Sequence, residues 1–232
     1  MAAQTLFVTG TDTGVGKTRV ALALLRALRT AGIDAVGFKP VASGARRTPA
    51  GLRNADAMAL WRAGPQPLAY RRVNPCCFAP PIAPHLAARE ARRRLSAAQL
   101  DRAHDWLARR HAVVVVEGAG GWHVPLDGRE RLSDWVLRRG WPVLLVVGLR
   151  LGCLNHAMLS AEAIGAPLSG WVANLLPPPL PRLTGNLATL RRVLPAPQWF
   201  ALDCGESPAT AARRLDREQL AAFGFAPPPP RT

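Results

Sequence analysis

A glycine-rich stretch near the N-terminus carries the clearest chemical signature of this chain. From Gly10 to Thr18 it reads Gly-Thr-Asp-Thr-Gly-Val-Gly-Lys-Thr. Glycines let successive backbone N–H groups point at phosphate oxygens, while the lysine reaches the outer phosphates and the threonine hydroxyl binds Mg²⁺. The stretch is a variant phosphate loop, because the usual spacing needs glycine at position 11 and this chain has Thr11. A glycine turn that arose by chance is the alternative interpretation.

The use of lysine singles out a second residue. Lys and Arg total 30, and Lys17 and Lys39 are the two lysines, so 28 are arginines. Lysine offers a compact, flexible ammonium group, whereas arginine offers a wide planar fork. A chain that uses arginine almost everywhere is expected to keep lysine where the compact cation is needed. Lys17 lies in the phosphate loop, which makes Lys39 a candidate of the same kind, with an ordinary exposed loop lysine as the alternative.

Three polar residues lie at or just after the ends of expected strands. Lys39 follows the apolar run 35–38 and precedes Pro40, which favours the end of a strand there, and Ser43 lies in the same loop. Glu117 follows four valines that indicate a buried parallel strand, and Gly118, Ala119 and Gly120 come next. Functional side chains of open α/β sheets gather at the carboxyl ends of strands. An acid at such a position can hold Mg²⁺, although a surface glutamate is the alternative.

Asp56 is a weaker candidate. It stands two residues after Asn54, a plausible helix cap, so it could serve a metal site or simply favour the first turn of a helix through the helix dipole. Further candidates are the free N–H groups of a helix that begins near Cys153, which could receive a carboxylate, and the strand-end amide of Asn174.

The elements that must position these residues alternate along the chain. Apolar runs of strand length alternate with segments of helical periodicity, which predicts an α/β protein of the P-loop NTPase type with a central, mostly parallel sheet flanked by helices on both faces. Strands are expected at 5–8, 35–38, 113–116, 143–147 and 171–174, and helices after the phosphate loop and near 96–107, 132–138, 183–193 and 209–220. Residues 1–222 are expected to form one domain, followed by a proline-rich tail at 223–232 that is expected to be disordered.

Composition narrows the possible classes of function. The net charge is +15, but the arginines are scattered and no RNA-binding signature with interleaved aromatics is present, so specific nucleic-acid binding is not expected. No apolar run approaches the roughly 20 residues that a membrane helix needs, so no membrane partner is expected. The four cysteines lack metal-site spacing, and no signal peptide is visible, which together favour the cytoplasm.

Taken together, these blocks resemble the dethiobiotin synthetases of the biotin pathway. The resemblance covers about residues 4–176, and its blocks occur in the order typical of that family, including the unusual spacing from Gly10 to Gly16. The matching stretches are 10–18, Lys39-Pro-Val-Ala-Ser-Gly, Leu52-Arg-Asn-Ala-Asp, Asn74-Pro, Val116-Glu-Gly-Ala-Gly-Gly-Trp, Asp134-Trp-Val, Leu151-Gly-Cys-Leu-Asn-His-Ala-Met and Gly170-Trp-Val-Ala-Asn.

The resemblance implies an ATP-dependent cyclo-ligase that acts in the cytoplasm with Mg²⁺. In such an enzyme, CO2 adds to one amine of 7,8-diaminopelargonate (7,8-diaminononanoate) as a carbamate. The carbamate then attacks the γ-phosphate of ATP, and the second amine closes the ring with release of phosphate. The resemblance also implies a homodimer in which the helix start formed by Cys153, Leu154 and Asn155 receives the substrate carboxylate from the opposite subunit.

The family pattern assigns roles to matching positions of this chain. Lys17, Lys39 and Thr13 would be catalytic, and Ser43 would help position the carbamate. The metal would be held by Thr18, Asp56 and Glu117. The nucleotide would be bound by these residues together with Gly14, Val15, Gly16, Lys17, Gly118, Ala119, Gly120 and Asn174, the last of which would read the adenine.

The C-terminal third departs from the family pattern. The only tyrosine is Tyr70, and Asn186 stands roughly where a substrate-holding tyrosine is expected. The segment 198–206 does not match cleanly either. Competing interpretations are a cobyrinate-type amide ligase, which would normally carry a glutaminase domain, a partitioning-type switch ATPase that binds DNA, membrane or a protein partner, and a nucleic-acid module that retains a nucleotide site.

Overall fold

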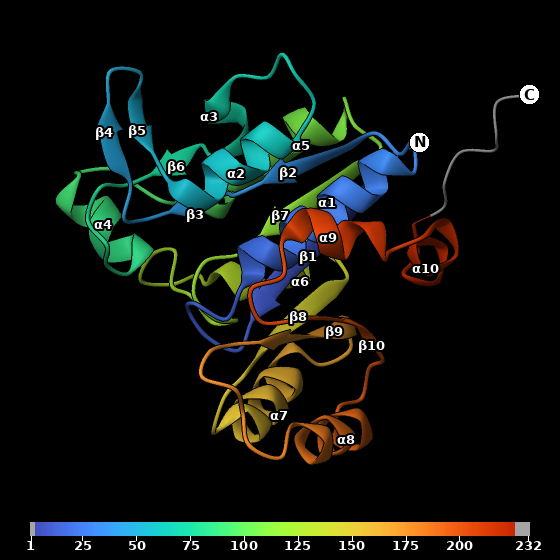
Figure 1. The fold of residues 1–232 in the computed structure, drawn as a ribbon. Helices are drawn as coiled ribbons and strands as arrows, with labels where there is room; N and C mark the ends of the chain where they lie inside the picture. Colours follow the sequence, from blue (N-terminus) through green and yellow to red (C-terminus); the bar gives the residue numbers. More distant parts are fainter. Residues whose placement is uncertain (1–2, 226–232) are drawn as a thin grey trace, which may run out of the picture.

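A central sheet of six parallel strands organises the chain in a computed structural model that describes residues 3–225. The strand order is β10-β9-β8-β1-β7-β2 (Figure 1). Each neighbouring pair runs parallel, so all the carboxyl ends lie at one edge. The strands are β1 Gln4–Gly10, β2 Ala35–Phe38, β7 Val113–Glu117, β8 Val143–Leu149, β9 Leu168–Leu175 and β10 Gln198–Leu202.

Helices cover both faces of the sheet and create two apolar cores (Figure 1). Successive strand residues point to opposite faces, so Phe7 packs into one core and Leu6 and Val8 into the other. The first core contains residues of α4 Pro84–Glu90, α5 Ala97–Ala108, α6 Leu132–Arg139, α7 Cys153–Ile164 and α8 Leu183–Val193. The second contains residues of α1 Lys17–Thr30, α2 Ala55–Ala63, α3 Tyr70–Val73, α9 Pro208–Arg213 and α10 Arg217–Ala222.

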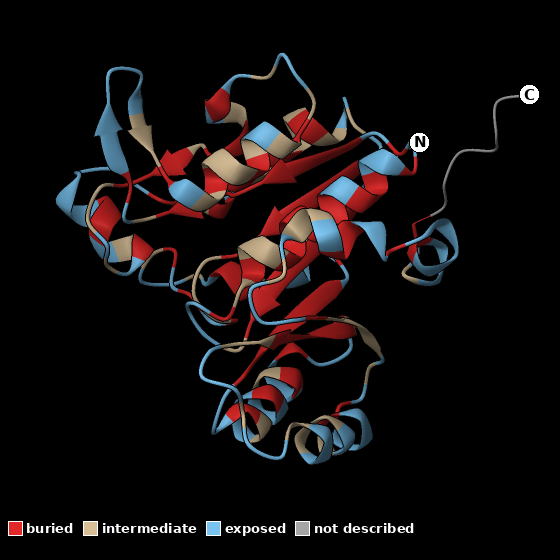
Figure 2. Ribbon diagram, viewed as in Figure 1, coloured by how far each residue is buried: buried red, intermediate tan, exposed pale blue. Residues whose placement is uncertain are grey.

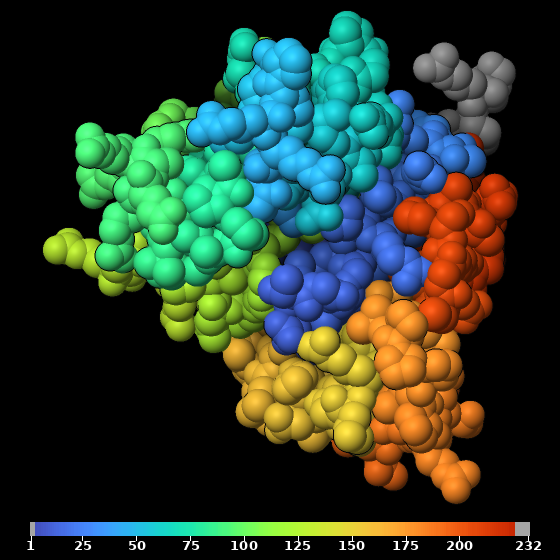
Figure 3. Space-filling model, turned by 60° about the vertical axis from the view of Figure 1, so that its left-hand side comes forward, coloured from blue at the N-terminus to red at the C-terminus, as the bar shows by residue number. Residues whose placement is uncertain are grey.

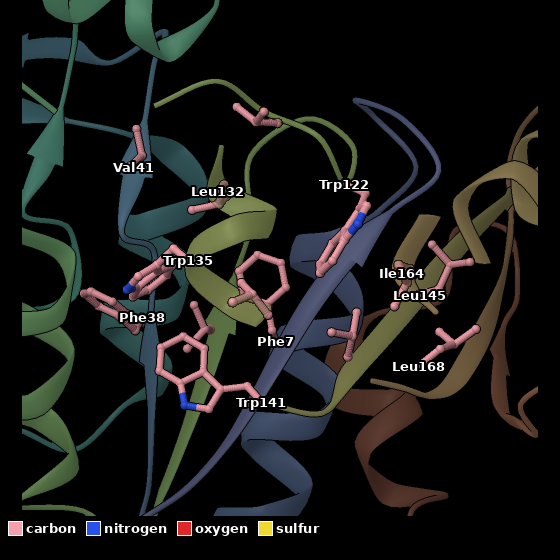
Figure 4. Close-up of a cluster of buried hydrophobic side chains, with 14 of the residues drawn as sticks. Phe7, Phe38, Val41, Trp122, Leu132, Trp135, Trp141, Leu145, Ile164 and Leu168 are labelled. Atoms are coloured by element: carbon pink, nitrogen blue, oxygen red, sulfur yellow. The ribbon is translucent and has the colours of Figure 1, made fainter. Parts of the chain in front are cut away.

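Burial follows this layering. The strands of the sheet are almost entirely buried except for the half-buried edge strand β10, and the helices expose mainly their outer sides (Figure 2). Aromatic residues fill the larger core, where Trp135 packs edge-on against Trp141 and Phe7 against Trp122 (Figure 4). The predicted P-loop α/β architecture is therefore confirmed.

An insertion between β2 and β7 extends the carboxyl edge of the sheet. It contains a small parallel pair, β3 Val41–Ala42 and β6 Cys76–Cys77, and an exposed hairpin, β4 Arg46–Thr48 with β5 Gly51–Arg53. The hairpin projects from one side of the molecule (Figure 1). These strands have only two or three residues each, too few to show a clear period, so the sequence did not predict them.

The C-terminal part differs from the prediction in three respects. The single helix expected at 209–220 is two helices, because Asp216 caps a new helix start and forms a reciprocal capping box with Gln219. Strand β10, which the sequence did not indicate, forms one edge of the sheet. Phe223 stacks on Trp199 and Phe225 is buried, so the packed body extends to residue 225. The remainder of the expected tail, 226–232, lies outside the described residues.

Between residues 3 and 225, no helix has both the length and the apolar character that a membrane crossing requires.

A buried histidine on α5 provides a test of the core. His104 contacts the Thr5 hydroxyl through Nε2 at 3.0 Å, and its ring lies 4.4 Å from that of Trp141. Burial lowers the pKa of His104 below its usual value, and the nearby Arg139 guanidinium acts in the same direction, although Asp105 opposes it. The folded protein therefore binds a proton at His104 less readily than the unfolded chain, in which this histidine becomes protonated below about pH 6.5.

Because of this histidine, we expect the free energy of unfolding to decrease as the pH falls below about 6.5, by at most about 1.4 kcal/mol per pH unit. Urea unfolding at pH 7.5, 6.5 and 5.5 measures this dependence. The His104→Gln variant cannot take up the proton and is expected to show a shallower loss over the same range. An equal slope in both proteins would contradict the assignment.

Candidate active site

A cleft of about 660 Å³ opens at the carboxyl edge of the sheet, beside the phosphate loop. The loop, dark blue in Figure 3, lies at the surface between the green middle segments and the yellow and orange C-terminal segments of the chain. Most of the predicted site residues line this cleft. They are Thr13, Gly14, Gly16, Lys17, Thr18, Lys39, Ser43, Asp56, Glu117, Ala119 and Gly120.

Sheet register brings Lys39 and Glu117 together. Phe38 of β2 pairs with Val116 of β7, so the residues that follow, Lys39 and Glu117, lie side by side at the carboxyl edge of the sheet. The Lys39 ammonium lies 2.5 Å from Glu117 Oε1, donates to the Gly118 carbonyl at 3.0 Å, and lies 3.5 Å from Asp56 Oδ2. Lys39 is 4% exposed and Glu117 1%. A buried charge is costly unless it is paired, so this ion pair holds both side chains in one geometry.

The Glu117 carboxylate is suited to bind a metal ion. Its Oε1 atom accepts hydrogen bonds from Lys39 and from the Thr18 hydroxyl, the latter at 2.8 Å. Its Oε2 atom is buried and has no protein partner. A buried carboxylate oxygen without a partner calls for a ligand, and carboxylate and hydroxyl oxygens suit Mg²⁺. Thr18, Asp56 and Glu117 could therefore hold Mg²⁺.

The metal site would not be complete on protein side chains alone. Among the described residues, no group of three or more His, Cys, Asp or Glu side chains is arranged to hold a metal ion. Mg²⁺ commonly binds through one or two carboxylates together with water and substrate phosphates. The donor set thus fits an ion that arrives with a nucleotide.

Lys17 is the second buried lysine of the cleft. Its ammonium donates to the Asp12 carbonyl at 2.8 Å, across the curl of the phosphate loop. Burial lowers the pKa of Lys17 to about 8, and the positive charge of Lys39 adds to this effect, although Glu117 and Asp56 oppose it. Two cations held near each other strongly favour an anion between them.

The loop owes its shape to glycine at one position in particular. Gly16 has φ of 92°, in the left-handed region, and a Cβ atom there would lie 2.1 Å from Asn174 Nδ2. Only glycine fits both the dihedral angle and the close approach. Helix α1 begins directly after it, so its first N–H groups face the cleft.

Asn174 lies at the end of β9, outside the cleft lining and fully buried. Its Nδ2 atom donates to the Val15 carbonyl at 2.7 Å, and its Oδ1 atom accepts from Arg19 Nη1 at 2.8 Å. The amide therefore lies at the end of its strand, as the sequence predicted, and contacts both the phosphate loop and the Arg19 side chain. Its role in reading a base remains a prediction.

Some predicted residues lie apart from the cleft. Cys153, Leu154 and Asn155 form the first turn of α7, as expected, but they do not line the cleft within this chain. Val15 is buried beneath the loop, and Gly118 contributes its carbonyl to Lys39 rather than to the cleft wall. Asn186 is on α8 and bonds to the carbonyls of Pro181 and Arg182.

The structure also adds residues that the sequence did not single out. Arg150 pairs with the Asp12 carboxylate at 2.5 Å and so links the loop after β8 to the phosphate loop. The cleft wall also includes Asn54 and His123. A scattered arginine in an arginine-rich chain carries no local signal, so Arg19 and Arg150 could not be recognised from the pattern.

The fold and the site define a class of protein. A parallel α/β sheet, a phosphate loop that opens a helix, and an acid at the end of a neighbouring strand are the parts of a P-loop nucleotide-binding protein. In agreement with this class, a family model described as an AAA domain matches residues 4–201.

Curated relatives specify the class further. The chain is 55% identical over 222 residues to the ATP-dependent dethiobiotin synthetase BioD of Pseudomonas paraeruginosa, covering 92% of this chain and 96% of that protein. It is 49% identical to BioD 1 of Salmonella typhi, with 89% and 92% covered, and 47% identical to BioD 1 of Escherichia coli O157:H7, with 89% and 93% covered. The chain belongs to the family of ATP-dependent dethiobiotin synthetases.

The oxygen without a partner leads to a prediction for Glu117. The Glu117→Gln change keeps the size of the side chain but removes its charge and replaces one oxygen by a donor. We expect ADP to bind the variant at least tenfold more weakly in the presence of Mg²⁺, and with nearly unchanged affinity in EDTA. Titration calorimetry under both conditions measures the difference. An unchanged effect of Mg²⁺ would remove Glu117 from the metal site.

Proposed function

We propose that this chain closes the ureido ring of dethiobiotin from 7,8-diaminopelargonate, CO2 and ATP, with release of ADP and phosphate. The observation that carries the proposal is the pair of buried lysines, Lys17 and Lys39, at the cleft beside the phosphate loop. The family membership supports it, since the curated relatives are named as ATP-dependent dethiobiotin synthetases.

The reaction has three steps. One amine of the substrate attacks CO2 and loses a proton, which forms a carbamate. A carbamate oxygen then attacks the γ-phosphorus of ATP, the bond to the bridging oxygen breaks, and ADP leaves. Finally, the second amine attacks the carbonyl carbon of the mixed anhydride and loses a proton, phosphate departs, and the ring closes.

The lysines suit the second step. Phosphoryl transfer depends on positioning and on neutralising negative charge more than on covalent help. Lys17 and Lys39 would stabilise the charge that develops between the carbamate and the γ-phosphate. Thr13 and Ser43, both on the cleft wall, would position the carbamate by hydrogen bonds.

The nucleotide would lie along the loop from Gly14 to Thr18, with Gly118, Ala119 and Gly120 close to it and Asn174 near the base. Thr18, Asp56 and Glu117 would hold Mg²⁺, which would neutralise charge on the phosphate oxygens. The free oxygen of Glu117 and the hydroxyl of Thr18 support this assignment.

We also propose a homodimer in the cytoplasm, in which the start of α7 receives the substrate carboxylate from the other subunit. Leu151 is 93% exposed immediately before α7, and Met158 and Leu159 are exposed on that helix. Exposed apolar residues in one region favour a protein interface. The four cysteines are free thiols, in keeping with a reducing compartment.

The function is tested by a carbon-fixation assay. The enzyme is incubated with Mg²⁺, ATP and labelled bicarbonate, with and without 7,8-diaminopelargonate. We expect phosphate release that depends on the diamine and equals the label found in an acid-stable product. ATP hydrolysis without the diamine and without fixed carbon would overturn the proposal and favour a switch ATPase.

Lys39 gives a sharper test, because arginine keeps the positive charge but not the shape. The pocket around its ammonium is closed by Glu117, Gly118 and Asp56, and a guanidinium is too wide and too rigid to replace it. We expect Lys39→Arg to lower turnover by at least a hundredfold, while ADP affinity changes less than fivefold. Turnover within about tenfold of the unsubstituted enzyme, a barrier change below about 1.4 kcal/mol, would contradict the catalytic role.

The control for this test is Arg26→Lys, a swap between the same two residue types at an exposed site on α1. We expect this variant to keep full turnover. Thermal melting of both variants shows whether a loss of activity reflects unfolding.

A further inference from the structure

Arg19 joins three segments at the carboxyl edge of the sheet. It lies on the first turn of α1, and its Nη1 atom donates to Asn174 Oδ1 at 2.8 Å. Its Nη2 atom donates to the carbonyl of Asp203 at 2.8 Å and to that of Glu206 at 2.6 Å. The two carbonyls belong to the connection between β10 and α9. The guanidinium thus satisfies three acceptors that converge on one place.

The orientation of the Asn174 amide follows from its neighbours. A guanidinium has only donors, so the amide atom that faces Arg19 must be the oxygen. The Val15 carbonyl can only accept, so the atom that faces it must be the nitrogen. Neither end allows the reversed amide. The guanidinium therefore lies among three oxygen acceptors, which are Asn174 Oδ1 and the carbonyls of Asp203 and Glu206.

Such a set of acceptors suits the amino edge of a base. Adenine presents an amino group as a donor, whereas guanine presents a carbonyl oxygen in the same position. A base attached to phosphates in the loop must lie near the start of α1 and the ends of the strands beside it. Asn174 Oδ1 and the carbonyls of Asp203 and Glu206 are at that edge, but the Arg19 guanidinium already uses them.

We propose that Arg19 determines base specificity by competing with the amino group of adenine for the acceptors on Asn174, Asp203 and Glu206, so that its side chain must be displaced before the base can be read. The inference rests on the proposed ATP-dependent function. Asn174 is fully buried and its Oδ1 atom already accepts from Arg19 Nη1, so a base that contacts this oxygen takes the place of the guanidinium.

Removal of the guanidinium should strengthen the binding of ATP. The Arg19→Met change keeps an unbranched apolar stem but removes every donor. We expect the KM for ATP to fall about fivefold and the affinity for ADP, measured by calorimetry, to rise by the same factor. GTP and GDP should change less than twofold, because their carbonyl edge finds only acceptors. The preference for adenine nucleotides should therefore increase.

The direction in which Arg19→Met changes the affinity for ADP tests the proposal. Weaker binding of ADP to Arg19→Met would mean that Arg19 supports the base site, and unchanged binding would mean that it plays no part there. Either outcome overturns the inference. An equal gain for ADP and GDP would also overturn it, since it would show a general electrostatic or steric effect.

Two further variants secure the test. Arg26→Met removes an exposed arginine from the same helix, and we expect its KM and ADP affinity to stay within twofold of the unsubstituted values. Arg19→Gln keeps a donor for the loop carbonyls and serves if Arg19→Met does not fold. We expect it to show a smaller gain in the same direction, and a loss of ADP affinity would overturn the proposal.

Failure of the two proposals can be told apart. The carbon-fixation assay on the unsubstituted enzyme tests the function, whereas ADP and GDP titrations test Arg19 without turnover. An enzyme that fixes no carbon but shows the expected change in nucleotide affinity would leave the inference about Arg19 intact.

Discussion

The buried contact between Lys39 and Glu117 is the interaction on which the site depends. Both residues leave adjacent parallel strands at the same level, because Phe38 pairs with Val116 in the sheet. A charge at 1% or 4% exposure is tolerable only with a partner at hydrogen-bond distance. The fold therefore holds the Lys39 ammonium and the Glu117 carboxylate together before any substrate arrives, and preorganised charge of this kind is what phosphoryl transfer requires.

Arginine and lysine have separate uses in this chain. Arginine forms ion pairs and stacks on aromatic rings. For example, the guanidinium carbons of Arg72 and Arg110 lie over the Trp106 ring, 4.1 and 4.0 Å from its centroid. The two lysines are both buried at the cleft. A compact ammonium can be enclosed by carbonyl and carboxylate oxygens where a guanidinium cannot. The distribution of the two residue types therefore reflects the shape of the space that each cation must fill.

Much of the fold and the centre of the site could be predicted from the sequence. The phosphate loop, the helix after it, the valine strand that ends at Glu117 and the caps at Asn54 and Ser96 all depend on local patterns, and the structure confirms each of them. The C-terminal part was predicted less well. The break between α9 and α10 and the edge strand β10 have weak local periods, and packing against the existing sheet decides such elements.

The sequence by itself determined which residues are candidates for the chemistry, because glycine spacing, strand-end acids and the scarcity of lysine are local or compositional signals. Tertiary structure decided which of them meet. Arg19 and the carbonyl of Glu206 are separated by 187 residues, and Arg150 and Asp12 by 138. No local pattern records such pairs, since they exist only after the parallel strands bring their carboxyl ends to one edge.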